Sequence, residues 1–91
     1  MTHPRWALVV APSAERGLAR LPGKAAAAVV EFMVGPLTED PRRVGHGLRG
    51  ELEGLWAARR GPYRVVYEID EPAREVRVLR IDHQADVYRP R

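Results

Sequence analysis

The chain has 91 residues, with 15 basic and 12 acidic side chains and a formal net charge of +3, and at this length we expect one domain spanning residues 1–91. It contains no cysteine, which excludes disulfides, thiolate metal ligands and a cysteine nucleophile. No apolar run approaches the roughly 18 residues of a membrane span, so we expect a soluble, unexported, cytoplasmic protein with no membrane partner.

The N-terminal half predicts one strand followed by two helices. Residues 6–11 form a short apolar run that ends at Pro12 and suits a buried strand. Ser13 is expected to cap the first helix, and Pro22-Gly23 to separate it from the second, which Gly35-Pro36 should end. Two helices joined by so short a break predict an αα-hairpin.

Residues 38–54 contain Pro41 and four glycines, which predicts a loop or a single broken turn. Residues 45–50 match the G-x-G-x-x-G pattern of dinucleotide-binding proteins. That motif requires a strand before it and a helix after it, and neither is predicted here. We therefore interpret these glycines as a source of mobility.

The C-terminal half predicts three strands. Residues 63–69 alternate apolar and polar side chains, and Gly61-Pro62 forms a turn between them and a shorter strand at residues 55–59. Residues 75–81 form the last strand, whose two faces both carry apolar groups, so the face that meets the helices stays open. The predicted fold is α+β, in the order β-α-α-β-β-β, with the two-helix hairpin on one face of a mainly antiparallel sheet.

The positive charge is concentrated around the predicted hairpin. Residues 1–41 have equal numbers of basic and acidic groups, whereas residues 42–64 contain six arginines against Glu51 and Glu53. Such clustering is typical of a surface that binds phosphate groups. An ordinary solvated surface rich in arginine remains the alternative.

Five residues could support chemistry on a phosphodiester: Arg59, Arg60, Arg64, His83 and Tyr88. In a meander, the end of the last strand returns beside the hairpin end that carries the arginines. Guanidinium groups bind phosphate and stabilise a charged transition state, while a phenol and an imidazole can exchange protons. The three histidines lack metal-ligand spacing, and we expect no metal or other cofactor. Alternatively, Tyr88 anchors the C-terminus, His83 is a strand-end residue, and Arg59 and Arg60 are soluble turn residues.

A resemblance is carried by residues 48–56, 59–67 and 78–81 and by His83 through Tyr88. These segments resemble the RelE branch of the RelE/ParE toxin superfamily. The resemblance implies a microbial RNase-like fold and the toxin of a type II toxin-antitoxin system, which enters the ribosomal A site and cuts messenger RNA without a metal. It also implies a cognate antitoxin that neutralises the toxin and, together with it, binds operator DNA.

By the same resemblance, Arg64 matches the arginine that contacts the scissile phosphate, and Tyr88 matches the proposed general base. Arg59 and Arg60 fall near a further cationic position. The chain departs from the pattern where lysines or an arginine are common, at Trp56, Ala58 and Gln84. His83 could supply part of the missing charge, and the further candidates for substrate binding are Arg49, Arg80 and Gln84.

The resulting hypothesis is a ribosome-dependent messenger RNA endoribonuclease, which uses the 2′-hydroxyl of the substrate to attack the scissile phosphate. Two alternatives stay open: a non-enzymatic DNA gyrase inhibitor of the ParE type, and a catalytically weak RNA-binding module. The missing lysines leave room for both alternatives.

Overall fold

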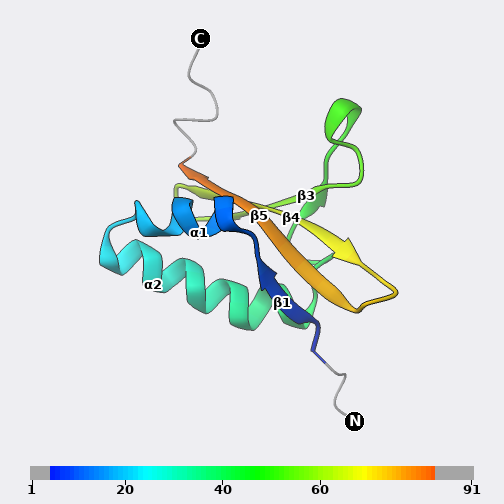
Figure 1. The fold of residues 1–91 in the computed structure, drawn as a ribbon, viewed down its shortest axis with the longest axis horizontal. Coiled ribbons are helices and arrows are strands. Elements are labelled where there is room, and N and C mark those ends of the chain that lie inside the picture. Colours follow the sequence, from blue (N-terminus) through cyan, green and yellow to red (C-terminus); the bar gives the residue numbers. More distant parts are fainter. Residues whose placement is uncertain (1–4, 84–91) are drawn as a thin grey trace.

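The computed structural model describes residues 5–83, which form two helices packed against a five-stranded sheet (Figure 1). The strands are β1 (Ala7–Val10), β2 (His46–Gly47), β3 (Trp56–Arg60), β4 (Tyr63–Asp70) and β5 (Glu75–His83). The helices are α1 (Pro12–Ala19) and α2 (Gly23–Phe32), followed by a π-helical segment, η1 (Met33–Leu37), and a 3-10 turn, η2 (Gly50–Leu52). The predicted α+β fold is confirmed, and β2 is an addition to it.

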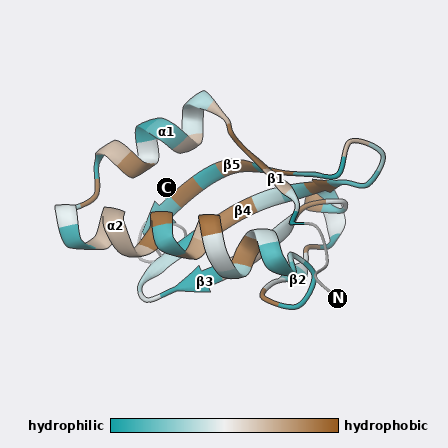
Figure 2. Ribbon diagram, turned by 90° about the horizontal axis from the view of Figure 1, so that it is seen from below, coloured by the Kyte–Doolittle hydropathy of each residue, from teal (hydrophilic) through white to brown (hydrophobic). Residues whose placement is uncertain are grey.

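The strands lie in the order β1-β5-β4-β3-β2. Only β1 and β5 run parallel, and the other three neighbouring pairs are antiparallel, as expected. Helix α2 lies across one face of the sheet, and α1 lies along β5 (Figures 1 and 2). We call the sheet face opposite α2 the open face.

The register of β4 decides which side chains reach each face. One cross-strand row packs in the core with the helices and consists of Ala58, Val65 and Ile81. Because side chains alternate along a strand, the adjacent row points to the open face and consists of Ala57, Val66 and Arg80.

Strand β5 contains a β-bulge at Leu79. Val66 pairs with Arg80 and Tyr67 pairs with Val78, so Leu79 has no partner on β4. In an unbroken strand, Ile81 would point away from the face to which Val78 points. The extra residue reverses the alternation and returns Ile81 to the core. This explains why both faces of this strand looked apolar in the sequence.

Helix α1 packs against the edge of β5 that extends beyond β1. Ser13 was expected to cap the helix, but Ala11 is the N-cap, and the Ser13 hydroxyl instead donates a hydrogen bond to the carbonyl oxygen of Leu79. One turn later, Gly17 lies so close that a Cβ atom there would stand 2.5 Å from the carbonyl oxygen of Ile81. Ser13 and Gly17 thus form the side of α1 that meets the sheet.

The second helix does not end at Gly35-Pro36, as expected. The chain stays helical through η1, which contains Pro36, and on through residues 38–39. Met33 and Leu37 are buried, and burying two such side chains offsets the roughly 3 kcal/mol that a proline costs inside a helix. None of the helices within residues 5–83 is long and apolar enough to cross a membrane.

The segment that was predicted as a loop contains β2, which pairs with the start of β3. Tyr67 holds the segment before β2 in place, because its buried hydroxyl donates a hydrogen bond of 2.5 Å to the carbonyl oxygen of Pro41. A side chain at position 45 would collide with this hydroxyl and with the backbone of Ala57, so a glycine is required there. The loop glycines therefore permit close packing as well as turning.

We expect Gly17→Ala to destabilise the protein by about 1–3 kcal/mol, because the added methyl group meets a backbone carbonyl that cannot move aside. The measurement is the free energy of unfolding in urea. Gly23→Ala is the matched control, since a Cβ atom at this position would contact nothing within 4 Å. Equal losses in the two variants would contradict the close approach of α1 to β5.

Burial, reinforced by the charge of Asp40, raises the pKa of Tyr67 to about 12. The unfolded chain ionises this tyrosine near pH ~10, so its contribution to stability is complete below pH ~10 and is lost as the pH rises towards 12. In Tyr67→Phe, the free energy of unfolding should fall less between pH 10 and 12 than in the wild type. At pH 7 the variant should be less stable by about 1 kcal/mol, because the hydrogen bond to Pro41 is missing. Unfolding free energies measured from pH 7 to 11 test both effects; parallel curves for the two proteins would refute the assignment.

Candidate functional site

The β3–β4 hairpin turns at Gly61-Pro62, as predicted. Gly61 has a φ of 60°, which glycine adopts at little cost, and proline holds its own φ near −65°. These values suit a tight two-residue turn, and the ladder closes on the pair Arg60 and Tyr63. The turn brings Arg59 and Arg64 opposite each other on neighbouring strands.

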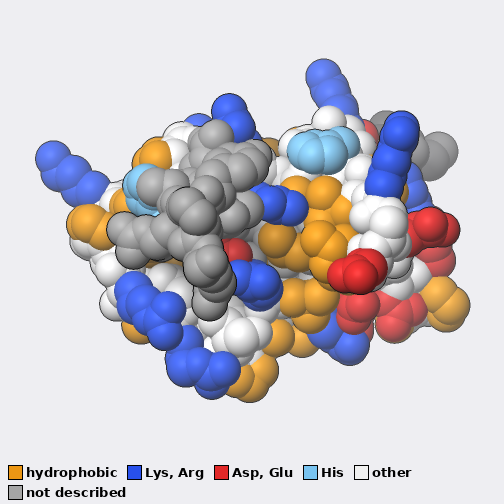
Figure 3. Space-filling view, turned by 90° about the horizontal axis from the view of Figure 1, so that it is seen from above, with side chains coloured by type: hydrophobic (Ala, Val, Ile, Leu, Met, Phe, Trp, Pro, Cys, Tyr) orange, Lys and Arg blue, Asp and Glu red, His pale blue; other side chains and the backbone are white. Residues whose placement is uncertain are grey.

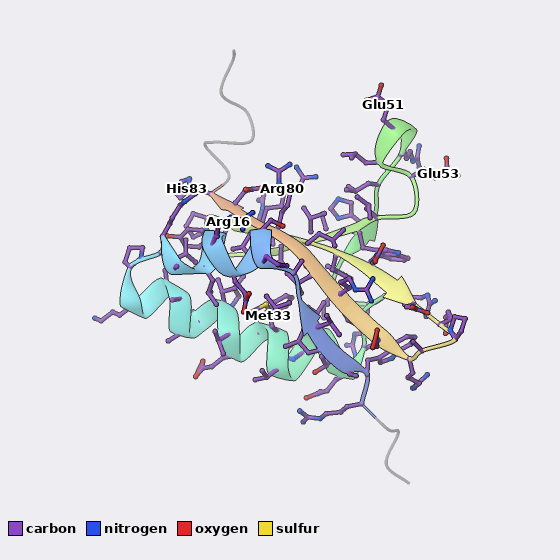
Figure 4. All side chains as sticks on the ribbon, viewed as in Figure 1. Arg16, Met33, Glu51, Glu53, Arg80 and His83 are labelled. Atoms are coloured by element: carbon purple, nitrogen blue, oxygen red, sulfur yellow. The ribbon has the colours of Figure 1, made fainter. Side chains whose placement is uncertain are left out.

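Three arginines lie on adjacent positions of the open face. The row at the hairpin end consists of Arg59, Arg64 and Asp82, and the next row ends in Arg80. In Figure 4, Arg80 projects from the sheet on the side opposite α2. Asp82 forms an ion pair with Arg80 at 3.1 Å. Asp82 was not among the residues predicted for the site, although its spacing of two residues from Arg80 at the end of a predicted strand was a usable signal.

The other candidate residues near the hairpin belong to the opposite face. Arg60, Tyr63 and His83 form a row whose positions alternate with those of the arginine row. The rings of Tyr63 and His83 meet edge to face, with centroids 5.3 Å apart. The single expected cluster is thus divided by the sheet, because neighbouring residues on a strand point in opposite directions.

The register also distinguishes Arg59 from Arg60, since only Arg59 shares the row of Arg64. Both arginines line a pocket of about 440 Å³ between α2 and β3, together with Glu31, Phe32 and Pro36. The two arginines therefore border the same space, although their strand positions assign them to different faces.

The floor of the open face is apolar. Ala57 and Val66 are buried, with 2% and 8% exposure, and Figure 3 shows an apolar area on this face with basic and acidic side chains at its border. The loop that carries Arg49 and η2 rises beside the sheet at this point (Figure 1). Leu48 closes the loop by donating its backbone N–H to the carbonyl oxygen of Leu55.

Trp56 and Ala58, assigned by resemblance to lysine positions, lie on the helix-facing side of β3. Ala58 belongs to the buried core and Trp56 packs against it. A lysine would be unfavourable in either place, because burying its charge is costly. The β3 positions on the open face are Ala57 and Arg59, so the cationic groups there are arginines.

Gln84 and Tyr88 lie outside the described residues. Within residues 5–83, no three histidine or carboxylate side chains come together in a way that could hold a metal ion. The arrangement on the open face is instead suited to an anion: three planar guanidinium groups with an apolar floor beside them match a phosphate and the sugar or base attached to it.

Comparison with known proteins identifies the family. The model for "ParE toxin of type II toxin-antitoxin system, parDE" matches residues 8–88. Toxin RelG of Mycobacterium tuberculosis is 52% identical over 77 residues, which cover 85% of this chain and 88% of the relative. Toxin RelE of the same organism is 48% identical over 87 residues, which cover 96% of this chain and 89% of the relative.

A solved structure supports the same relationship. The toxin-antitoxin complex RelBE2 of Mycobacterium tuberculosis contains a chain that matches with a TM-score of 0.86 and 45% identity, covering 88% of this chain and 99% of that chain. Sequence and backbone thus agree over nearly the whole domain. The protein belongs to the ParE toxin family of type II toxin-antitoxin systems and, within it, to the group of RelE toxins.

Proposed function

We propose that the protein is a ribosome-dependent endoribonuclease that cleaves messenger RNA in the ribosomal A site and so inhibits translation. The observation that carries this proposal is the set of three arginines, Arg59, Arg64 and Arg80, on adjacent positions of the open face. A phosphodiester bound among them gains negative charge as the 2′-hydroxyl attacks, and guanidinium groups stabilise that charge. The resemblance to RelE toxins points to the same reaction.

In this mechanism, Arg64 contacts the scissile phosphate and Arg59 is the second cation, since it lies directly opposite Arg64. Arg80, restrained by Asp82, binds the flanking backbone. Tyr88 remains the proposed general base, on the resemblance alone. The register argues against Arg60 and His83 as direct partners of Arg64.

We also propose a cognate antitoxin that neutralises the protein in the cytoplasm and with it binds operator DNA. The relative in the RelBE2 structure is described as part of a toxin-antitoxin complex. Apolar surface for such a partner is present on α2 and η1, where Val30 and Val34 are 38% and 50% exposed. An amphipathic acidic helix would bury these side chains, and a further acidic segment of the same partner that reaches the open face would compete with phosphate for the arginines.

We expect Arg64→Ala to slow messenger RNA cleavage on translating ribosomes at least ~100-fold, because the guanidinium acts on the charge of the transition state. Arg64→Lys should be intermediate, since it keeps the charge but loses the planar fork. The cut ends are mapped by primer extension. Lys24→Ala, which removes an exposed charge at the start of α2, is the control and should cleave normally.

Cleavage by Arg64→Ala at the wild-type rate would refute the role of this residue. If the wild-type protein leaves messenger RNA intact and instead blocks gyrase in a supercoiling assay, the ParE-type alternative is correct. The observation that favours this alternative is the match of residues 8–88 to the ParE toxin family model.

The affinity for RNA should fall steeply as the salt concentration rises. Each phosphate contact to a single strand contributes about 0.7 to the slope of the logarithm of the binding constant against the logarithm of the salt concentration. With a 2′-O-methyl oligoribonucleotide, which cannot be cleaved by its own hydroxyl, Arg59→Ala and Arg80→Ala should each reduce the slope by roughly that amount. Arg16→Ala, on α1, is the matched control. An unchanged slope in both open-face variants would place the phosphate contacts elsewhere.

A further inference from the structure

Beyond the open face, the structure contains a pocket of about 300 Å³ at the C-terminal end of α1. Along most of its length α1 is held against β5, by the hydrogen bond from Ser13 and by the close approach of Gly17. After Ala19 the chain turns away through Pro22 into α2. The helix and the strand therefore separate, and the space between them is the pocket.

The lining of this pocket combines flat rings, aliphatic walls, one arginine and one carboxylate residue, Asp82. The residues that give it this character are Arg20, Leu21, Pro22, Tyr63, Ile81 and His83. Tyr63 and His83 meet edge to face, so the lining presents two aromatic rings, and aromatic rings are groups on which flat ligands stack. Arg20 is exposed at the rim, where its planar guanidinium can stack as well as donate hydrogen bonds. Proteins bind splayed-out RNA bases with these groups.

Two residues that line the pocket are next to residues of the proposed cleavage site in the sequence. Tyr63 directly precedes Arg64 on β4, and His83 directly follows Asp82 on β5. Figure 4 places His83 at the end of β5, close to the end of α1, whereas Arg80 projects to the open face. Consecutive Cα atoms are about 3.8 Å apart, so the two sites adjoin along the backbone, although their side chains point to opposite faces and an RNA that uses both must pass around the end of the sheet.

We propose that this pocket binds the base of a nucleotide adjacent to the scissile phosphate, and that the RNA bends around the end of the sheet between the two faces. The inference rests on the proposed function. A base suits the pocket better than a second phosphate, because the C-terminus of α1 carries partial negative charge and, among residues 5–83, Arg20 is the only arginine or lysine in the lining, which also contains Asp82.

The test uses ribosomes programmed with messenger RNA whose A-site codon is 2′-O-methylated, so that the protein binds without cleaving. An abasic nucleotide replaces each codon position in turn, which removes one base and keeps every phosphate. At one position, wild-type affinity should fall between about fivefold and a hundredfold, the range expected for one stacked base. Arg20→Ala should weaken binding to the intact codon and shrink that abasic penalty.

Arg16→Ala is the matched control, because Arg16 lies one turn earlier on the same helix and outside the pocket. It should retain the full abasic penalty. Tyr63→Leu should remove the abasic penalty. If the loss of Tyr63 disturbs folding, Arg20→Ala still provides the test, because Arg20 is exposed.

The outcomes separate the pocket from the proposed function. If the protein cleaves unmodified messenger RNA, but the abasic penalty is absent or is equal in wild type and Arg20→Ala, the pocket does not bind a base and only this inference fails. Weakened binding of the antitoxin by Arg20→Ala, with RNA binding unchanged, would likewise overturn it. A protein that neither binds nor cuts on programmed ribosomes would refute the proposed function itself.

Discussion

The bulge at Leu79 is the constraint on which the arrangement of both sheet faces depends. It lets Val76 and Val78 on one side of it, and Ile81 on the other, all point into the core, which places Arg80 and Asp82 on the open face. A bulged residue leaves its backbone groups outside the strand ladder, and here the Ser13 hydroxyl satisfies the carbonyl. The same contact holds α1 against β5. The bulge at Leu79 therefore determines the packing of the core, the position of α1 and the location of the charged side chains.

Electrostatically, the open face combines attraction with restraint. Three arginines on adjacent positions repel one another in the absence of an anion, and Asp82 reduces this repulsion while restraining Arg80. An exposed ion pair of this kind adds little to stability. Its value lies in orientation, because an arginine that is already held loses less conformational entropy when it binds phosphate. The buried side chains of Ala57 and Val66 provide a rigid base beneath these charges.

A short hairpin can serve two binding functions because its side chains alternate. Arg64 faces the open side and Tyr63 the helix side, although the two are consecutive. At the end of a sheet these directions converge on one ligand, since nothing beyond the turn separates them. The proposed phosphate site and the neighbouring pocket can in this way bind one ligand, provided that the ligand is flexible enough to follow the bend, as single-stranded RNA is.

The sequence alone was enough to predict four features: the α+β class, the strand at residues 63–69, the Gly61-Pro62 turn and the clustering of arginines near that turn. These could be predicted because period-two alternation, turn residues and charge are local properties of the chain. The tertiary structure alone decided the register. The structure shows a bulge at Leu79 and a second helix that continues through Pro36. Ser13 is not a cap but contacts a residue 66 positions away, and His83 lies on the other face of the sheet from Arg64. These features depend on burial and on partners distant in the chain, and no local pattern encodes which carbonyl a serine will meet or which face of a strand the core will cover.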